Sequence, residues 1–146
     1  MSRDPIFVPV LVQVALTLGV YVALIKAKLR AKAAGQVELA RAAIDDTAWP
    51  ESVRKINNNI RNQFEVPVLF YVLAGALWAL DAVHEVALIV AWLFVLSRVV
   101  HAWIHIGSNY VPARRRMFTF GWLAVLAMAV LVAWELIGRV SGYGPI

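Results

Sequence analysis

Hydrophobic residues collect into four long runs along the chain, and polar segments separate these runs. A helix needs about 20 apolar residues to cross a bilayer core, so the pattern predicts four membrane-spanning helices. We expect the spans at residues 6–28, 58–80, 83–106 and 118–138. The connection between the second and third spans is short, which favours antiparallel neighbours. The expected fold is therefore one all-α domain, a four-helix membrane bundle with up-down-up-down order.

The composition supports a membrane protein. Of the 146 residues, 62% are hydrophobic and only 16% are charged, whereas a soluble domain is about half apolar and about a quarter charged. The chain has no cysteine, which excludes a disulfide, a cysteine nucleophile and a thiolate metal site. Any sulfur chemistry must therefore use a sulfur atom that the substrate brings.

The net charge of +5 is concentrated at the end of the first span and in two connections, 29–57 and 107–117. The positive-inside rule predicts that both connections are cytoplasmic loops and that both termini lie outside. A basic chain can also bind nucleic acid, but the sequence carries no nucleic-acid-binding motif. Topology and attraction to anionic headgroups explain the charge better.

Four polar residues share one predicted helical face at the start of the second span, because they are spaced by 3, 4 and 7 positions. They are Asn58, Arg61, Asn62 and Glu65. Arg61 and Glu65 also have the spacing of an intrahelical ion pair. The face is either the solvated start of a helix or a ligand-binding surface. The neighbouring Asn57, Asn59 and Gln63 are interpreted as solvated at the membrane interface, and Pro67 predicts a kink or a loosened turn.

The third span carries Arg98, His101 and His105 at positions i, i+3 and i+7, again on one face. A single histidine here would be a packing residue, but three aligned polar groups favour a site. Arg98 lies about two turns inside the span and needs a counter-charge, for which Glu65 is the expected partner.

The fourth span begins with Arg114, Arg115 and Arg116, which are either a topology signal or part of a site. Together these groups offer guanidiniums, imidazoles, amides and a carboxylate at one end of the bundle. Guanidiniums bind carboxylates through paired hydrogen bonds, and a carboxylate binds an ammonium. We expect a small zwitterionic or polyanionic ligand, bound between subunits because one bundle has little room for it.

Two stretches, RNQFE with the proline that follows and SRVVHAWIHIGSNYVPARRRMFTF, resemble the MAPEG family, the membrane-associated proteins of eicosanoid and glutathione metabolism. The resemblance covers all four spans and is closest to small bacterial-type members. It implies a homotrimer in the bacterial inner membrane, with glutathione as cosubstrate at each subunit interface near the cytoplasmic side. It also implies a lipophilic second substrate that enters from the bilayer, as in microsomal glutathione transferases.

The resemblance implies that Arg114 is catalytic, because the family's thiolate-stabilising arginine falls there. The residues expected to bind glutathione are Lys28, Asn58, Arg61, Asn62, Glu65, Arg98, His101, His105 and Arg115. Arg115 stands where prostaglandin synthases have serine, while His105 and Phe118 stand where tyrosine is common or can occur. These departures argue against prostaglandin isomerisation.

Three hypotheses follow from the residues and the resemblance. The first is an enzyme that conjugates glutathione to lipophilic electrophiles or uses it to reduce lipid hydroperoxides. The second is a non-catalytic membrane protein of the same fold that binds lipid or serves as a scaffold. The third is a metal-dependent membrane enzyme with His101, His105 and Glu65 as ligands. The two nearby arginines disfavour a cation, so no metal site is expected.

Overall fold

The computed structural model describes residues 2–142, and most of them are helical. Five helices dominate, and three single-turn helices join them. The longer helices are α1 (Phe7–Ala33), α3 (Glu51–Gln63), α4 (Val66–Ala79), α5 (Glu85–Ile106) and α6 (Val111–Val140). The short ones are η1 (Asp4–Ile6), α2 (Leu39–Ala42) and η2 (Asp46–Ala48). No strand occurs within residues 2–142, so the all-α expectation is confirmed.

Three helical segments of the described chain are long and apolar enough to cross a membrane: Asp4–Ala33, Glu85–Ile106 and Val111–Val140. The second apolar run instead forms two helices, α3 and α4. Helix α4 has only 14 residues, fewer than the about 20 that a full crossing requires. Several helices also extend past the expected spans, since α3 begins at Glu51 and α6 at Val111.

Pro67 explains the break between α3 and α4. Phe64 and Glu65 leave the helical conformation, and α4 restarts at Val66 with Pro67 in its first turn. Proline has no backbone N–H, and its ring clashes with the carbonyl four residues earlier, which belongs to Gln63. An interruption was expected at this point, and the structure has a complete break.

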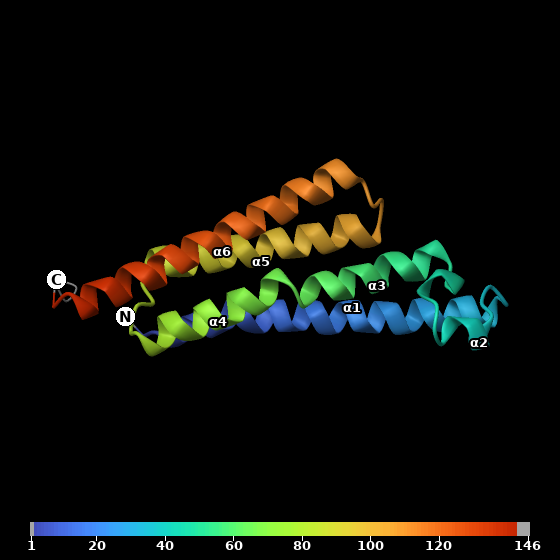
Figure 1. Cartoon of the computed structure of the whole chain (residues 1–146), viewed down its shortest axis with the longest axis horizontal. Coiled ribbons are helices and arrows are strands. Elements are labelled where there is room, and N and C mark those ends of the chain that lie inside the picture. The colour runs from blue at the N-terminus through green and yellow to red at the C-terminus, as the bar shows by residue number, and fades with distance from the viewer. Residues whose placement is uncertain (1, 143–146) are drawn as a thin grey trace.

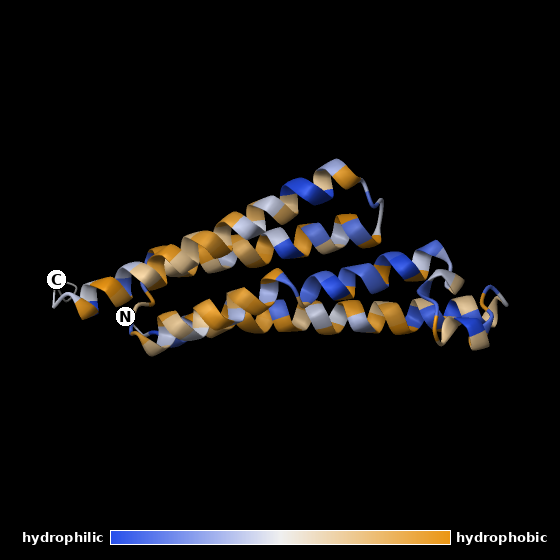
Figure 2. Cartoon of the chain, in the orientation of Figure 1, coloured by the Kyte–Doolittle hydropathy of each residue, from blue (hydrophilic) through white to orange (hydrophobic). Residues whose placement is uncertain are grey.

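The helices lie roughly parallel or antiparallel in an elongated molecule (Figure 1). Helices α3 and α4 run back along α1, while α5 and α6 pair along their length. The polar residues gather toward one end, over α3, the last turns of α1 and the first turns of α6 (Figure 2). We call this the basic end. The other end, where η1 begins and α6 finishes, is mostly apolar.

Small residues let the helices approach closely. Ala74, Ala87 and Ala91 are fully buried, and Gly121 of α6 lies directly against α5. Around them, the Phe70 and Phe94 rings stack with centroids 4.4 Å apart. Close van der Waals contacts of this kind hold membrane helices together, because the hydrophobic effect does not drive apolar side chains out of lipid.

Substituting Gly121 with alanine is expected to destabilise the α5–α6 pair. A Cβ at residue 121 would lie 2.7 Å from the Ser97 hydroxyl oxygen, which is itself fixed by donating to the Phe94 carbonyl at 2.6 Å. Overpacking of this kind costs about 1–3 kcal/mol, so thermal unfolding in detergent should occur at a lower temperature.

The matched control is Gly75→Ala in α4, where an added Cβ meets nothing within 4 Å. Alanine there should be neutral or stabilising by about 0.5–1 kcal/mol. Equal unfolding temperatures for the two variants would contradict the close α5–α6 approach.

Candidate functional site

A pocket of about 230 Å³ opens at the basic end between α3, α5 and α6. It collects polar side chains from three segments that are far apart in the sequence. Its lining residues are Asn62, His101, Val111, Arg114, Arg115 and Phe118. Four of these six residues were expected at the site from the sequence, so the structure brings together the ends of α3 and α5 and the start of α6.

Arg98 lies beneath this pocket and is only 1% exposed. Its guanidinium donates to the Asn62 carbonyl at 2.8 Å and lies 6.0 Å from the centroid of the Phe118 ring. Asn62 is the next-to-last residue of α3, so no N–H of the helix lies four residues on to donate to its carbonyl. Arg98 thus satisfies a carbonyl that the helix break has freed.

Glu65, the expected counter-charge of Arg98, makes no direct ion pair with it, although the Glu65 charge still acts on Arg98 through space. Among residues 2–142, no nitrogen–oxygen pair of these two side chains lies within 4.0 Å. Glu65 sits in the break with a non-helical backbone, φ −97° and ψ −101°, and is exposed. The break interrupts the helical periodicity that would place Glu65 on one face with Asn62.

The two histidines are buried and take complementary hydrogen-bonding roles. His101 Nδ1 lies 3.2 Å from the Arg114 carbonyl, so its N–H can donate there. His105 Nδ1 lies 3.4 Å from the amide nitrogen of Asn62 and can accept from it. Their rings meet edge to face, with centroids 5.6 Å apart. The pair therefore links α5 to both α3 and α6.

Arg114 is held by a residue that the sequence did not single out. Its guanidinium donates to the Asn109 side-chain oxygen at 2.6 Å, and Asn109 has a φ of 51°. Asparagine adopts this left-handed conformation more readily than most residues. The Asn109 turn between α5 and α6 thus orients the Arg114 side chain; a turn-forming asparagine five residues before an arginine was the available signal.

Besides Glu65, Arg98 and His105, three more of the expected ligand-binding residues do not line the pocket in this chain. Arg61 is exposed and pairs with Asp46 at 2.5 Å instead of with Glu65, so the predicted Arg61–Glu65 ion pair is wrong. Asn58 is exposed, and its carbonyl accepts from the Asn62 amide at 3.2 Å. Lys28 of α1 lies over the Trp49 ring, 5.0 Å from its centroid.

Asp46 belongs to a structured turn ahead of α3. Its neighbour Asp45 accepts hydrogen bonds from the Thr47 hydroxyl and backbone N–H and from Arg41. These bonds, the Thr47 hydroxyl foremost, hold the pKa of the Asp45 carboxyl below its usual range. The turn is therefore fixed at neutral pH and would lose these bonds only as the pH falls through that lowered pKa.

Buried amides form a second polar feature, and here the interpretation of Asn59 and Gln63 as solvated is wrong. Gln13 of α1 donates to Gln63 at 2.8 Å, and Gln63 donates to Asn59 at 3.0 Å. All three are at most 1% exposed. Asn57 is different, because it reaches the Asp46 carboxylate at 3.3 Å. A lone glutamine inside the first apolar run was the signal for a polar partner.

The metal-centre hypothesis finds no support in the geometry. Across residues 2–142, no three His, Cys, Asp or Glu side chains are close enough to hold one ion. Glu65 does not join His101 and His105.

Comparison with known proteins agrees with the resemblance in the sequence. The family model of the MAPEG family matches residues 6–134. No curated protein and no protein of solved structure shows significant similarity to the chain. The family match covers α1, α3, α4 and α5 in full and α6 as far as residue 134, and it includes all the pocket residues at the basic end. This integral membrane protein belongs to the MAPEG family.

Proposed function

We propose that the protein is a glutathione-dependent membrane enzyme that acts on lipophilic electrophiles. The observation that carries the proposal is the meeting of Arg114, Arg115, Asn62 and His101 in one pocket of about 230 Å³. Family membership is consistent with this role. In conjugation, the glutathione thiolate attacks an electrophilic carbon and the leaving group departs. In reduction of a hydroperoxide, the thiolate attacks the terminal oxygen to give a sulfenic acid, and the alkoxide leaves and is protonated to the alcohol. The thiol of a second glutathione then attacks the sulfenic acid, which forms the disulfide and releases water.

The charges of the site suit the charges of glutathione, which has two carboxylates, one ammonium and one thiol. Arg114 is already oriented by Asn109 at 2.6 Å, so it loses little conformational entropy on binding an anion. A fixed guanidinium beside the sulfur favours the thiolate, which is the nucleophile. Arg115 and Arg61 can bind carboxylates, and the exposed Glu65 can bind the ammonium.

The pocket of one chain is too small to be the whole site. Its volume of about 230 Å³ is below the about 300 Å³ at which small-molecule sites begin. We therefore propose that a second copy completes the site in a homotrimer. Lys28, Asn58 and Arg61, which lie outside the pocket here, would meet the ligand at that subunit interface.

We further propose that each subunit is a four-helix bundle in which the broken α3–α4 segment acts as the second span. The broken pair runs back along α1, so that η1 and the end of α6 lie at the same end of the molecule (Figure 1). A chain that crosses the membrane an even number of times has both termini on the same side. With the basic end in the cytoplasm of a bacterial inner membrane, both termini would lie outside, as the positive-inside rule requires.

A groove between α4 and α6 could receive the lipophilic partner. It encloses about 280 Å³, and its lining is entirely apolar: Leu69, Val72, Leu73, Trp122, Val125, Leu126 and Ala129. The same groove favours the second candidate, a non-catalytic lipid-binding or scaffold protein. Binding of glutathione without any turnover would support that candidate over the enzyme.

Replacing Arg114 with alanine should lower the turnover of an aromatic halide or a lipid hydroperoxide by about 100-fold, as expected when a preorganised charge at a reacting centre is lost. The assay uses purified protein in detergent with saturating glutathione. The matched control is Arg116→Ala, which removes an exposed arginine that does not line the pocket. Equal activity in the two variants would contradict the catalytic role of Arg114.

Replacing Arg61 with alanine should weaken glutathione binding about tenfold or more, because a charge-assisted hydrogen bond contributes about 1.5–3 kcal/mol. The readout is the rise in unfolding temperature that glutathione produces. Arg54→Ala is the control, since Arg54 is an exposed arginine on the same helix. If wild-type protein gains no stability from glutathione, the proposed ligand is wrong.

Replacing Asp46 with asparagine should strengthen glutathione binding. The Asp46 carboxylate forms an ion pair with the Arg61 guanidinium at 2.5 Å. A ligand carboxylate that binds Arg61 must therefore displace the Asp46 carboxylate. An exposed ion pair is worth about 0.2–1 kcal/mol, and its removal should raise the affinity by up to about fivefold in the same thermal assay. Weaker binding by Asp46→Asn would mean that Asp46 helps the site rather than competing with the ligand.

A further inference from the structure

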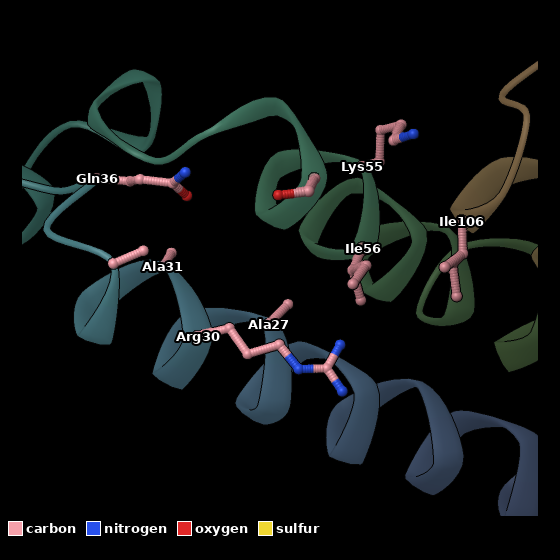
Figure 3. A pocket seen from close by; sticks show the side chains of 9 residues that line it. Ala27, Arg30, Ala31, Gln36, Lys55, Ile56 and Ile106 are labelled. Carbon is pink, nitrogen blue, oxygen red and sulfur yellow. The ribbon is translucent and has the colours of Figure 1, made fainter.

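A second pocket lies at the basic end, nearer the start of α3 than the candidate glutathione site. It encloses about 330 Å³ between the last turns of α1, the first turns of α3 and the end of α5. Figure 3 shows Arg30 and Ala27 of α1 on one wall and Ile56 of α3 on the other, with Gln36 directed into the space. None of its lining residues belongs to the pocket that holds Arg114.

The polar groups of this pocket are suited to an anion. Arg30 and Lys55 are cationic, Ser52 and Gln36 can donate hydrogen bonds, and no lining residue is acidic. The Arg30 guanidinium has no hydrogen-bond or ion-pair partner in the described part of the chain. Lys55 donates to the Gly107 carbonyl at 3.0 Å, which leaves two of its three N–H groups for a ligand.

The rest of the lining is apolar and small. Alanines of α1 make room beside Ile56 and Ile106, so a bound molecule would meet both hydrocarbon and a cation on each of the two helices. The position fits such a mixed lining, because the apolar run of α1 ends at Ile25 and the basic turns follow at once. Such a pocket lies at the depth of lipid headgroups, where basic clusters between helices bind phosphates.

We propose that this pocket binds the phosphate of an anionic phospholipid. The Arg30 guanidinium would hold the phosphate through paired hydrogen bonds, and the Lys55 ammonium would add a point charge. Ser52 lies in the first turn of α3, where the positive end of the helix dipole also favours an anion. The apolar side chains of the lining would contact the first methylenes of an acyl chain, which a free phosphate ion lacks.

The test measures thermal unfolding of the purified full-length protein in an uncharged detergent, without glutathione. Phosphatidylglycerol, phosphatidylcholine, glycerol 3-phosphate and inorganic phosphate are added separately. Wild-type protein should be stabilised by phosphatidylglycerol at a concentration at least about tenfold lower than phosphatidylcholine requires, and Arg30→Gln and Lys55→Gln should each lose this preference. Lys32→Gln is the control, because it removes the same charge from an exposed residue of α1 that does not line the pocket.

Stabilisation by glycerol 3-phosphate or inorganic phosphate alone, with the same dependence on Arg30 and Lys55, would support a phosphate site but identify its source as soluble. Equal preference for phosphatidylglycerol in wild type, Arg30→Gln and Lys55→Gln would overturn the proposal. So would an Arg30→Gln variant that keeps this preference and loses the response to glutathione, because the pocket would then belong to the other site. The proposal stands independently of glutathione binding.

Discussion

The hydrogen bond from Arg98 to the Asn62 carbonyl, 2.8 Å long, is the interaction on which the basic end depends. A buried guanidinium is costly unless its N–H groups find acceptors. A helix normally offers none at its side, because each carbonyl is engaged with an N–H four residues on. Pro67 changes this by ending α3, so that the Asn62 carbonyl is left for Arg98. The break at Pro67 thereby provides one of the hydrogen bonds that join α5 to α3, beside the Asn62–His105 contact.

The pocket is built outward from that contact. With Arg98 fixed, His105 lies against the Asn62 amide and His101 against the Arg114 carbonyl, so α6 is joined to the same group. Gly121 allows α6 to pack directly on α5, and the Asn109 turn returns the chain so that the Arg114 side chain is oriented by Asn109. The polar groups therefore have fixed geometry before any ligand arrives, which is what favours catalysis by a preorganised charge.

The sequence predicted well where one regular helix carries the pattern. Arg98, His101 and His105 share a face of α5 because that helix is continuous, and the expected periodicity holds. The same reasoning failed for Glu65, since helical periodicity stops at the break that Pro67 causes. The sequence showed the proline, but the direction in which the chain leaves a break depends on packing against other helices.

Contacts between distant segments could not be predicted from the sequence, for a different reason. Whether Asn59 and Gln63 face water or protein is decided by Gln13, which lies about 50 residues away in α1 and was read only as part of an apolar run. The Asp46–Arg61 pair and the Asn109–Arg114 hydrogen bond likewise depend on how two loops return to their helices. A side chain's partner is therefore harder to predict than the helix that carries it.

Stabilisation of a glutathione thiolate by Arg114, held by Asn109, is tested most directly by the ultraviolet absorbance of the thiolate in the complex at neutral pH. We expect a thiolate signal when glutathione binds the wild-type protein and none when Arg114 is replaced by alanine. A thiolate signal of equal size in both proteins, or bound glutathione that stays fully protonated in the wild type, would contradict it.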